Sequence, residues 1–164
     1  MSSVLKVNTI RHTNGTSGMT IDSSGRVFQP TKPSFNAHRN SGGDIAANTG
    51  SSGVVIFNST TVNIGNGFDT STGKFTAPVA GTYFFSTSCL TTATNSATDL
   101  QIRVDDVRVA QGRADAHSAL QNSIFISVIA TLTASQVVHV HINIGGGIYG
   151  STGEYNTFCG YLIG

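Results

Sequence analysis

The amino-acid sequence predicts an all-β protein, a two-sheet antiparallel jelly-roll sandwich preceded by a short β-strand anchor. Ser, Thr, Asn and Gly make up 71 of the 164 residues, only 10% of the residues are charged, and Trp is absent. This composition is typical of strands and turns rather than helices. Short runs alternate between apolar and polar residues, and none shows a persuasive 3.6-residue period. The length suits one domain with a short extension at one end.

Residues 1–32 form the predicted anchor. Two alternating runs, residues 4–10 and 19–27, are separated by Asn-Gly and Ser-Gly turn signals within residues 14–18, which predicts two or three very short strands. Such a ribbon is marginal alone in water, so it must pack on something else. The segment 30–33, with a proline at each end, then predicts a stiff, extended connector. We therefore expect the domain boundary directly after residue 32.

Residues 33–164 form the predicted sandwich. They contain eight segments in which apolar and polar residues alternate, and each segment predicts an antiparallel strand. These are residues 33–39, 54–64, 74–90 with a kink at Pro78, 99–104, 107–111, 120–132, 137–144 and 155–163. Asp105 and Asp106 join two of them with no spare residue, which favours a two-residue hairpin turn over a calcium site. Eight strands suit a two-sheet jelly roll.

The faces of these segments differ in polarity. In residues 99–104 and 137–144 apolar residues alternate with polar ones, so one face is expected to contact solvent. In residues 124–132 and in the last segment, 155–163, both faces are apolar. A sandwich buries only one face of each sheet, so a sheet that is apolar on both sides needs a further partner. Self-association is the simplest answer, through the outward residues Phe125, Ile129, Tyr161 and Ile163.

Charge and hydropathy exclude several classes of function. The formal net charge is +1, from 9 basic and 8 acidic residues spread thinly, so nucleic acid is not an expected partner. No apolar stretch approaches the roughly 20 residues that span a bilayer. Residues 1–8 also lack the apolar region of a secretory signal. We expect synthesis in a cytoplasm and no membrane insertion.

Residues that could carry chemistry do not form a known motif. Cys89 and Cys159 have no C-x-x-C pairing, which favours buried free thiols. His139 and His141 share a strand face without a third ligand nearby, so a surface pair is favoured over a transition-metal site. The sequence has no nucleophile elbow, and the glycines at 145–147 lie between strands rather than before a helix. We expect no enzyme activity, no metal and no cofactor.

One spacing carries a family resemblance. It comprises Phe57, Asn63, Phe68, Phe75 and the run Gly-Thr-Tyr-Phe-Phe at residues 81–85. This order resembles the signature of the C1q-like globular domain, the head of complement C1q and of its relatives in the tumour-necrosis-factor superfamily.

The end of the chain supports the same resemblance. Residues 156–162, Asn-Thr-Phe-Cys-Gly-Tyr-Leu, resemble the closing strand of that family. The pattern departs at Thr87, where the family usually has a further aromatic residue. Over residues 33–164 the resemblance implies a ten-strand jelly roll that assembles as a homotrimer, with the four outward residues named above at the interface.

The anchor has a resemblance of its own. Residues 5–27 are similar to short β segments that recur in bacteriophage tail fibres, notably those of marine cyanobacterial phages. Complement proteins precede this head with collagen Gly-X-Y triplets, and none is present here. The resemblance implies docking on a virion, through the apolar anchor residues Val4, Leu5, Val7, Ile10, Met19, Ile21 and Val27.

Together the two resemblances imply a non-enzymatic trimeric virion fibre protein, made in the host cytoplasm. Its expected partners are its own copies, other virion proteins and a host surface glycan or protein. The long connections (40–53, 91–98, 112–119, 145–154) alternate with short ones (69–73, 105–106, 133–136), so the long ones should emerge together, away from the anchor. Candidate receptor contacts there are Arg113, Asp115, His117, Tyr149 and Glu154. The alternative is a purely structural decoration or connector protein of a phage capsid or tail.

Overall fold

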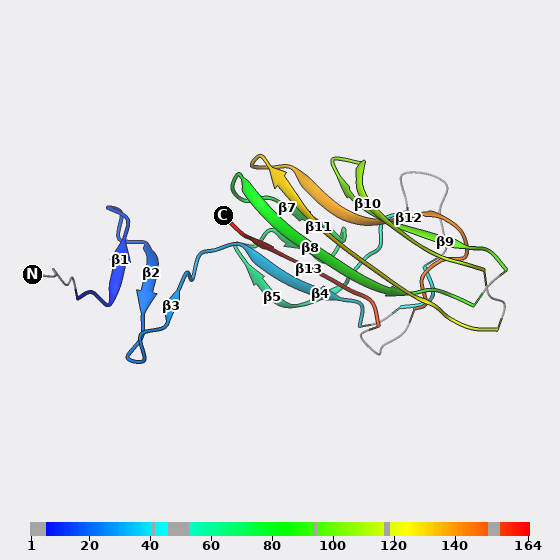
Figure 1. The fold of residues 1–164 in the computed structure, drawn as a ribbon, viewed down its shortest axis with the longest axis horizontal. Helices are drawn as coiled ribbons and strands as arrows, with labels where there is room; N and C mark the ends of the chain where they lie inside the picture. Colours follow the sequence, from blue (N-terminus) through cyan, green and yellow to red (C-terminus); the bar gives the residue numbers. More distant parts are fainter. Residues whose placement is uncertain (1–5, 41, 46–52, 94, 117–118, 151–154) are drawn as a thin grey trace, which may run out of the picture. The chain divides into compact units, whose positions relative to one another are not determined.

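The computed structural model describes residues 6–40, 42–45, 53–93, 95–116, 119–150 and 155–164. The chain divides into two compact units, Met1–Lys32 and Pro33–Gly164, which are described separately below. All regular structure in the described residues is β-strand (Figure 1). No helix long and apolar enough to cross a membrane occurs in this part of the chain. The all-β prediction is confirmed.

The first unit is an antiparallel sheet in the order β1-β2-β3. Its strands are β1 (Thr9–Arg11), β2 (Ser17–Ile21) and β3 (Val27–Phe28). The first turn contains Gly15, whose φ of 88° favours glycine, and the Asn14 side chain accepts a hydrogen bond from the Thr16 N–H (3.0 Å). Ser17 and Gly18, expected in that turn, lie in β2, because the chain has already reversed at Thr16.

None of the described residues of this unit is buried. Of the predicted docking residues, Ile10 and Val27 are 51% and 56% exposed, Val7, Met19 and Ile21 are half-buried, and Val4 and Leu5 lie outside the described residues. Ile10 pairs with Met19, and Ile21 pairs with Val27, so these side chains share one face of the sheet. Nothing in the described part of the unit buries this apolar face.

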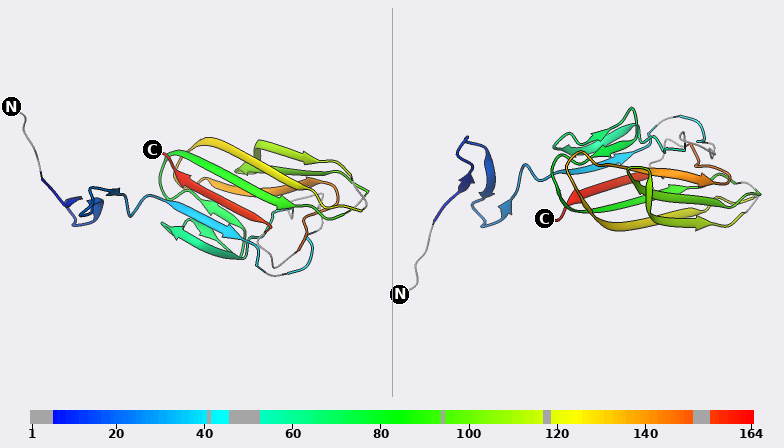
Figure 2. Two further views of the ribbon diagram at one scale, coloured as in Figure 1. Left: turned by 60° about the horizontal axis from the view of Figure 1, so that its bottom comes forward. Right: turned by 90° about the horizontal axis from the view of Figure 1, so that it is seen from above.

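The second unit is a sandwich of two five-stranded antiparallel sheets, seen as two layers in Figure 2. One sheet has the order β11-β8-β13-β4-β5 and the other β10-β9-β12-β7-β6. The strands are β4 (Ser34–His38), β5 (Ser59–Ile64), β6 (Phe68–Asp69), β7 (Lys74–Thr76), β8 (Gly81–Leu90), β9 (Thr98–Val104), β10 (Val107–Ala114), β11 (Ser123–Leu132), β12 (Val137–Ile144) and β13 (Thr157–Leu162). This is the predicted jelly-roll-like arrangement.

Some strand boundaries differ from those expected. The segment 74–90 is two strands in different sheets, because the chain crosses between the sheets near Pro78. Strand β6 lies outside every predicted segment, since two residues are too few to show alternation. The expected short connection 69–73 is therefore the tip of a β6–β7 hairpin. Strand β10 continues to Ala114, so the first residues of the expected connection 112–119 belong to a strand.

The predicted hairpin turn at Asp105 and Asp106 is confirmed. Both residues have positive φ, 47° and 65°, as in the mirror-image turns that join antiparallel strands. The Asp105 carboxylate accepts hydrogen bonds from the Val137 N–H and the Gln136 side-chain amide, both at 2.9 Å. These bonds hold the pKa of Asp105 below its usual value. They tie the β9–β10 turn to the β11–β12 connection.

Aromatic rings fill the centre of the sandwich. Phe35 stacks on Phe68 and Phe75 at centroid distances of 4.8 and 4.9 Å, and Phe158 packs against it edge-on at 5.0 Å. Such pairs stabilise a core beyond the area that they bury. A Cβ added at Gly160 would lie 2.7 Å from the Phe35 ring, so this packing requires glycine there.

The described parts of the long connections lie together at one end of the sandwich, here called the loop end (Figure 1). Ile148 is bridged to Ile45 and to Thr91, which joins the connections after β4, β8 and β12. The Thr91 N–H donates to the Asn122 carbonyl (2.8 Å), which adds the connection after β10. The opposite end carries the β9–β10 turn and the carboxyl terminus. The chain enters the sandwich there, because the Pro33 carbonyl accepts a hydrogen bond from the last strand.

Candidate functional site

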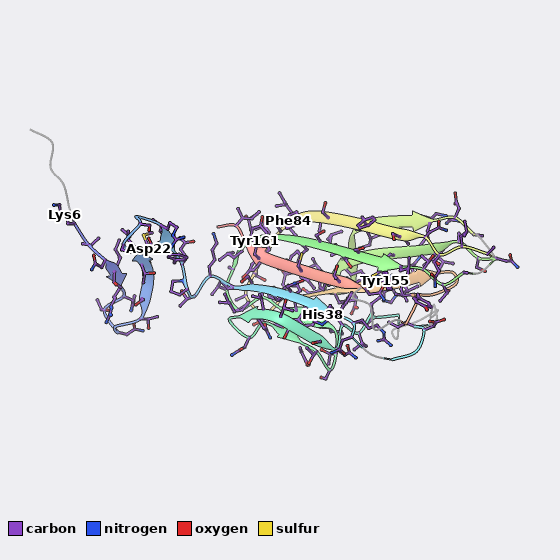
Figure 3. The ribbon with its side chains drawn as sticks, turned by 90° about the horizontal axis from the view of Figure 1, so that it is seen from below. Lys6, Asp22, His38, Phe84, Tyr155 and Tyr161 are labelled. Atoms are coloured by element: carbon purple, nitrogen blue, oxygen red, sulfur yellow. The ribbon has the colours of Figure 1, made fainter. Side chains whose placement is uncertain are left out.

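The outward side of sheet β11-β8-β13-β4-β5, here called the assembly face, exposes large apolar side chains. Phe84 is paired with both Ile129 and Tyr161, and the rings of Phe84 and Tyr161 are 5.4 Å apart (Figure 3). Ile129 is 63% exposed, Tyr161 49%, Phe125 75% and Ile163 43%. An exposed apolar band of this kind marks an interaction surface. The prediction that these four side chains point away from the core is confirmed.

The two cysteines are free and occupy different environments. Cys89 is fully buried inside the sandwich, and burial raises the pKa of its thiol to about 12. Cys159 is only half-buried, because it is paired with Ser86 on the assembly face. Burial raises the pKa of Cys159 as well. Both side chains are therefore neutral thiols at pH 7, and the prediction of a buried thiol is confirmed for Cys89 alone.

Arg113 and Asp115 lie together at the loop end. Arg113 Nη1 is 3.2 Å from Asp99 Oδ1, and Arg113 Nε is 4.0 Å from Asp115 Oδ1. The Asp99 side chain is 5% exposed, that of Arg113 56% and that of Asp115 98%. A buried carboxylate thus fixes an exposed guanidinium next to an exposed carboxylate. Sequence reasoning missed Asp99, because only the cross-strand pairing of Asp99 with Arg113 reveals the contact.

The other three candidate receptor contacts do not extend this pair. Tyr149 is half-buried, and its backbone N–H donates to the Leu90 carbonyl (2.8 Å), which holds it at the end of β8. His117 and Glu154 lie outside the described residues. The structure therefore brings two of the five candidates, Arg113 and Asp115, into one site.

A buried amide that the sequence did not single out joins two connections of the loop end. The Asn156 side chain accepts a hydrogen bond from the Leu90 N–H (2.9 Å) and donates one to the Tyr149 carbonyl (2.8 Å). Asn156 is 0% exposed. Its amide therefore satisfies two backbone groups that water does not reach.

Replacing Asn156 with Ala is expected to lower the free energy of unfolding by about 2–4 kcal/mol, because two backbone groups lose their partners. Urea denaturation followed by circular dichroism measures this change. Asn95→Ala, at an exposed amide in the connection after β8, is the control and should change stability by less than about 0.5 kcal/mol. Equal midpoints for the two variants would contradict the assigned role of Asn156.

His139 and His141, predicted as a surface pair, are buried, with 1% and 4% exposure. They point away from the core, but neighbouring residues flank them closely: Lys74 and Arg103 beside His139, and Val54 and Gln101 beside His141. The expectation of a solvent-exposed strand face is therefore wrong here. Burial lowers the pKa of His139 to about 4 and lowers that of His141, so both rings are neutral at pH 7. Within the described residues, no group of three or more His, Cys, Asp or Glu is placed to hold a metal.

The sequence profile of the C1q domain matches residues 34–163. The chain belongs to the C1q domain family. Complement C1q tumor necrosis factor-related protein 3 of human and of mouse are each 56% identical to it over 36 residues. That match covers 22% of this chain and 15% of those proteins. The chain therefore spans only a small part of the length of these curated relatives.

Solved structures show the same fold. The globular domain of zebrafish complement 1qA is 20% identical, with a TM-score of 0.65 over 81% of this chain and 98% of that one. Eiger TNF from S. frugiperda is 12% identical, with a TM-score of 0.64 over 82% and 94%. Murine APRIL is 12% identical, with a TM-score of 0.59 over 80% and 98%. C1q and TNF-like domains typically form trimers, often act in binding and are typically not enzymes.

The residues that carry the C1q spacing have identifiable roles in this head. The Asn63 amide bonds both backbone groups of Phe68, at 2.9 and 3.1 Å, and so closes the β5–β6 turn. Thr87, where the sequence departs from the family pattern, is buried, and its hydroxyl donates to the Thr157 carbonyl (2.8 Å). A hydrogen bond between β8 and β13 thus stands where the family usually has an aromatic ring.

Proposed function

We propose that this C1q-family chain is a non-enzymatic, homotrimeric fibre protein of a bacteriophage virion. Residues 1–32 dock on the particle and the loop end binds the host cell surface. The main observation in support of trimer assembly is the apolar assembly face. Removing one large apolar side chain from water contributes about 1.5–3 kcal/mol, and three copies around an axis would cover this face without leaving an open edge. The trimers typical of the family support the same assembly.

The virion assignment is supported by the resemblance of residues 5–27 to phage fibre segments. The lack of buried residues in the described part of the first unit also supports it, since such a sheet needs contacts from outside itself. The chain enters the head at Pro33, at the end opposite the loop end. A particle attached through residues 1–32 therefore leaves the long connections accessible.

The assignment of host binding to the loop end is supported by Arg113 and Asp115. Arg113 is held by the buried Asp99 and is still more than half exposed. A guanidinium fixed in this way can form directed hydrogen bonds to a glycan or a surface protein at little cost in side-chain entropy.

Competition for adsorption tests host binding. Purified protein added to host cells before the phage is expected to reduce adsorption, because it occupies the same receptors. Asp115→Asn removes an exposed charge at the loop end and should raise the half-inhibitory concentration about tenfold, as expected for a charged hydrogen bond. Arg11→Gln, which removes an exposed charge from β1, is the control and should inhibit adsorption as the wild type does. Adsorption that is insensitive to the wild-type protein would rule out this part of the proposal.

The alternative is a structural decoration or connector protein without a host receptor. It is favoured by the packing of the loop end, where Ile148 is fully buried and Asn156 joins two connections. Connections that pack and hydrogen-bond to one another in this way can close the end of the sandwich without binding a receptor. On this alternative, wild-type protein assembles into particles and leaves adsorption unchanged.

A further inference from the structure

A row of basic side chains crosses the outward face of sheet β10-β9-β12-β7-β6. Strand pairing places Lys74 opposite His139, His139 opposite Arg103, and Arg103 opposite Arg108. Side chains paired in this way share one face and lie about 5 Å apart at their Cβ atoms. The face is on the other side of the sandwich from the assembly face. A trimer formed through the assembly face therefore leaves this basic row accessible.

The positive charges of the row are not neutralised within the described residues. Neither Lys74, Arg103 nor Arg108 has a carboxylate within 4.0 Å there. Arg103 and Arg108 face each other directly, and like charges paired across strands are destabilising. Two carboxylates flank the row: Asp69 is paired with Lys74 at the β6 end, and Asp106, which is 83% exposed, lies 3.5 Å from His139 Nε2. The two arginines have no such partner, and a bound anion would offset the cost of their repulsion.

Neutral amides hold the two guanidinium groups in place. Arg103 donates to the Gln101 side chain (2.8 Å) and to Asn143 (3.2 Å), and Arg108 donates to Gln111 (2.6 Å). Gln101 in turn donates to Gln111 (3.1 Å), which links the two arginines through one network. The guanidinium groups are thus oriented without losing their charge, as a pre-organised anion site requires.

Two hollows open along this row, and Asp106 lines both. The larger, of about 410 Å³, is lined by Gln101, Arg103, Asp106, Val107, Arg108 and Asn143. The smaller, of about 240 Å³, is lined by Lys74, Asp105, Asp106, Val137 and His139. His139 is 1% exposed, and neither of its ring nitrogens has a hydrogen-bond partner in the described structure. A buried ring that makes no hydrogen bond at the wall of a hollow offers a polar group to a ligand there.

We propose that the basic row binds an oxyanion carried by a sugar, a carboxylate or sulfate group of an acidic glycan. The two arginines match the paired oxygens of such a group. Gln101 and Asn143 line the same hollow and offer amide groups to sugar hydroxyls. A nucleic acid fits less well, because the linings contain no Phe, Tyr or Trp side chain for base stacking and the net charge is only +1. The site is distinct from the loop end and does not depend on host binding there.

Calorimetric titration of the full-length protein tests the proposal. D-glucuronate and glucose 6-sulfate are expected to bind, whereas D-glucose is not, and the relative affinities of the first two distinguish carboxylate from sulfate. Arg108→Gln should weaken binding of the anionic sugars at least tenfold, as expected for loss of a charged hydrogen bond. Arg11→Gln, which removes an exposed charge from β1, is the matched control and should bind as the wild type does.

The imidazole of His139 supplies a second readout that a purely structural role for Arg108 would not change. The groups that face it are Lys74, Arg103, His141 and Asp106, and the first three disfavour its protonation. A bound oxyanion should therefore raise the pKa of His139 above its value of about 4, as followed by NMR of the ring. Arg108→Gln should remain folded, because it removes a repulsion and no buried partner.

Three results would overturn the proposal. One is binding of D-glucose as tight as that of D-glucuronate, and another is equal affinity of the Arg108→Gln and Arg11→Gln variants for the anionic sugars. The third is a single-stranded oligothymidylate that binds more tightly than either anionic sugar and loses affinity in Arg108→Gln, which would assign the row to nucleic acid instead.

Discussion

Replacing Tyr161 with Asp is expected to convert the proposed trimer, with about three times the chain mass of 17.0 kDa, to a monomer. Tyr161 is 49% exposed on the assembly face and packs beside Phe84. In the proposed trimer it is closed off from water, and an unpaired carboxylate there costs several kcal/mol in each copy. Such a cost weakens association by more than about a thousandfold. Light scattering coupled to size-exclusion chromatography measures the mass directly.

Two further variants separate lost assembly from lost folding. Tyr161→Phe keeps the ring and should remain trimeric. Val79→Asp places the same charge at a residue of similar exposure, 44%, in the connection between β7 and β8 rather than in a strand of the assembly face, and should also remain trimeric. Circular dichroism should show native strand content for all three variants. A wild-type protein that is a stable monomer, or a Tyr161→Asp variant that stays trimeric, would contradict the assembly proposed here.

Alternation in the sequence predicted on which side of its sheet a residue lies, because side chains in a strand alternate strictly between its two sides. In residues 120–132 the same run has Ile124 and Ile126 buried in the core and Phe125 and Ile129 exposed. That both faces of this sheet are apolar could therefore be predicted without a structure. The β6–β7 hairpin could not, since β6 has two residues and the exchange of sheets near Pro78 leaves no change in the pattern.

The contacts within the sites were less accessible to sequence reasoning. Arg113 was a candidate because it is charged and near a long connection, but its partner Asp99 is 14 positions away on the adjacent strand. The burial of His139 likewise depends on Lys74 and Arg103, which only strand pairing brings beside it. Alternation reports the side of a sheet on which a residue lies. It carries no information about which distant strand lies next to it.

Deleting residues 1–32 is expected to leave a folded, trimeric head that is no longer incorporated into virions. Every buried residue of the described chain lies at position 33 or later, so the deletion removes nothing from the core of the sandwich. The first unit, by contrast, has exposed apolar side chains on one face and no described residue that is buried. Such a sheet gains stability only when that face is covered, which the proposed docking site on the particle would do.

Immunoblots of purified virions, with a capsid protein as the loading reference, measure incorporation. Val27→Asp should reproduce the deletion, because Val27 is 56% exposed on the apolar face and a charge there opposes docking. Thr13→Asp, in the exposed first turn of the same unit, is the matched control and should be incorporated normally. Truncated protein found on particles at wild-type levels would refute the docking role of residues 1–32. Equal incorporation of the two point variants would contradict docking through the apolar face.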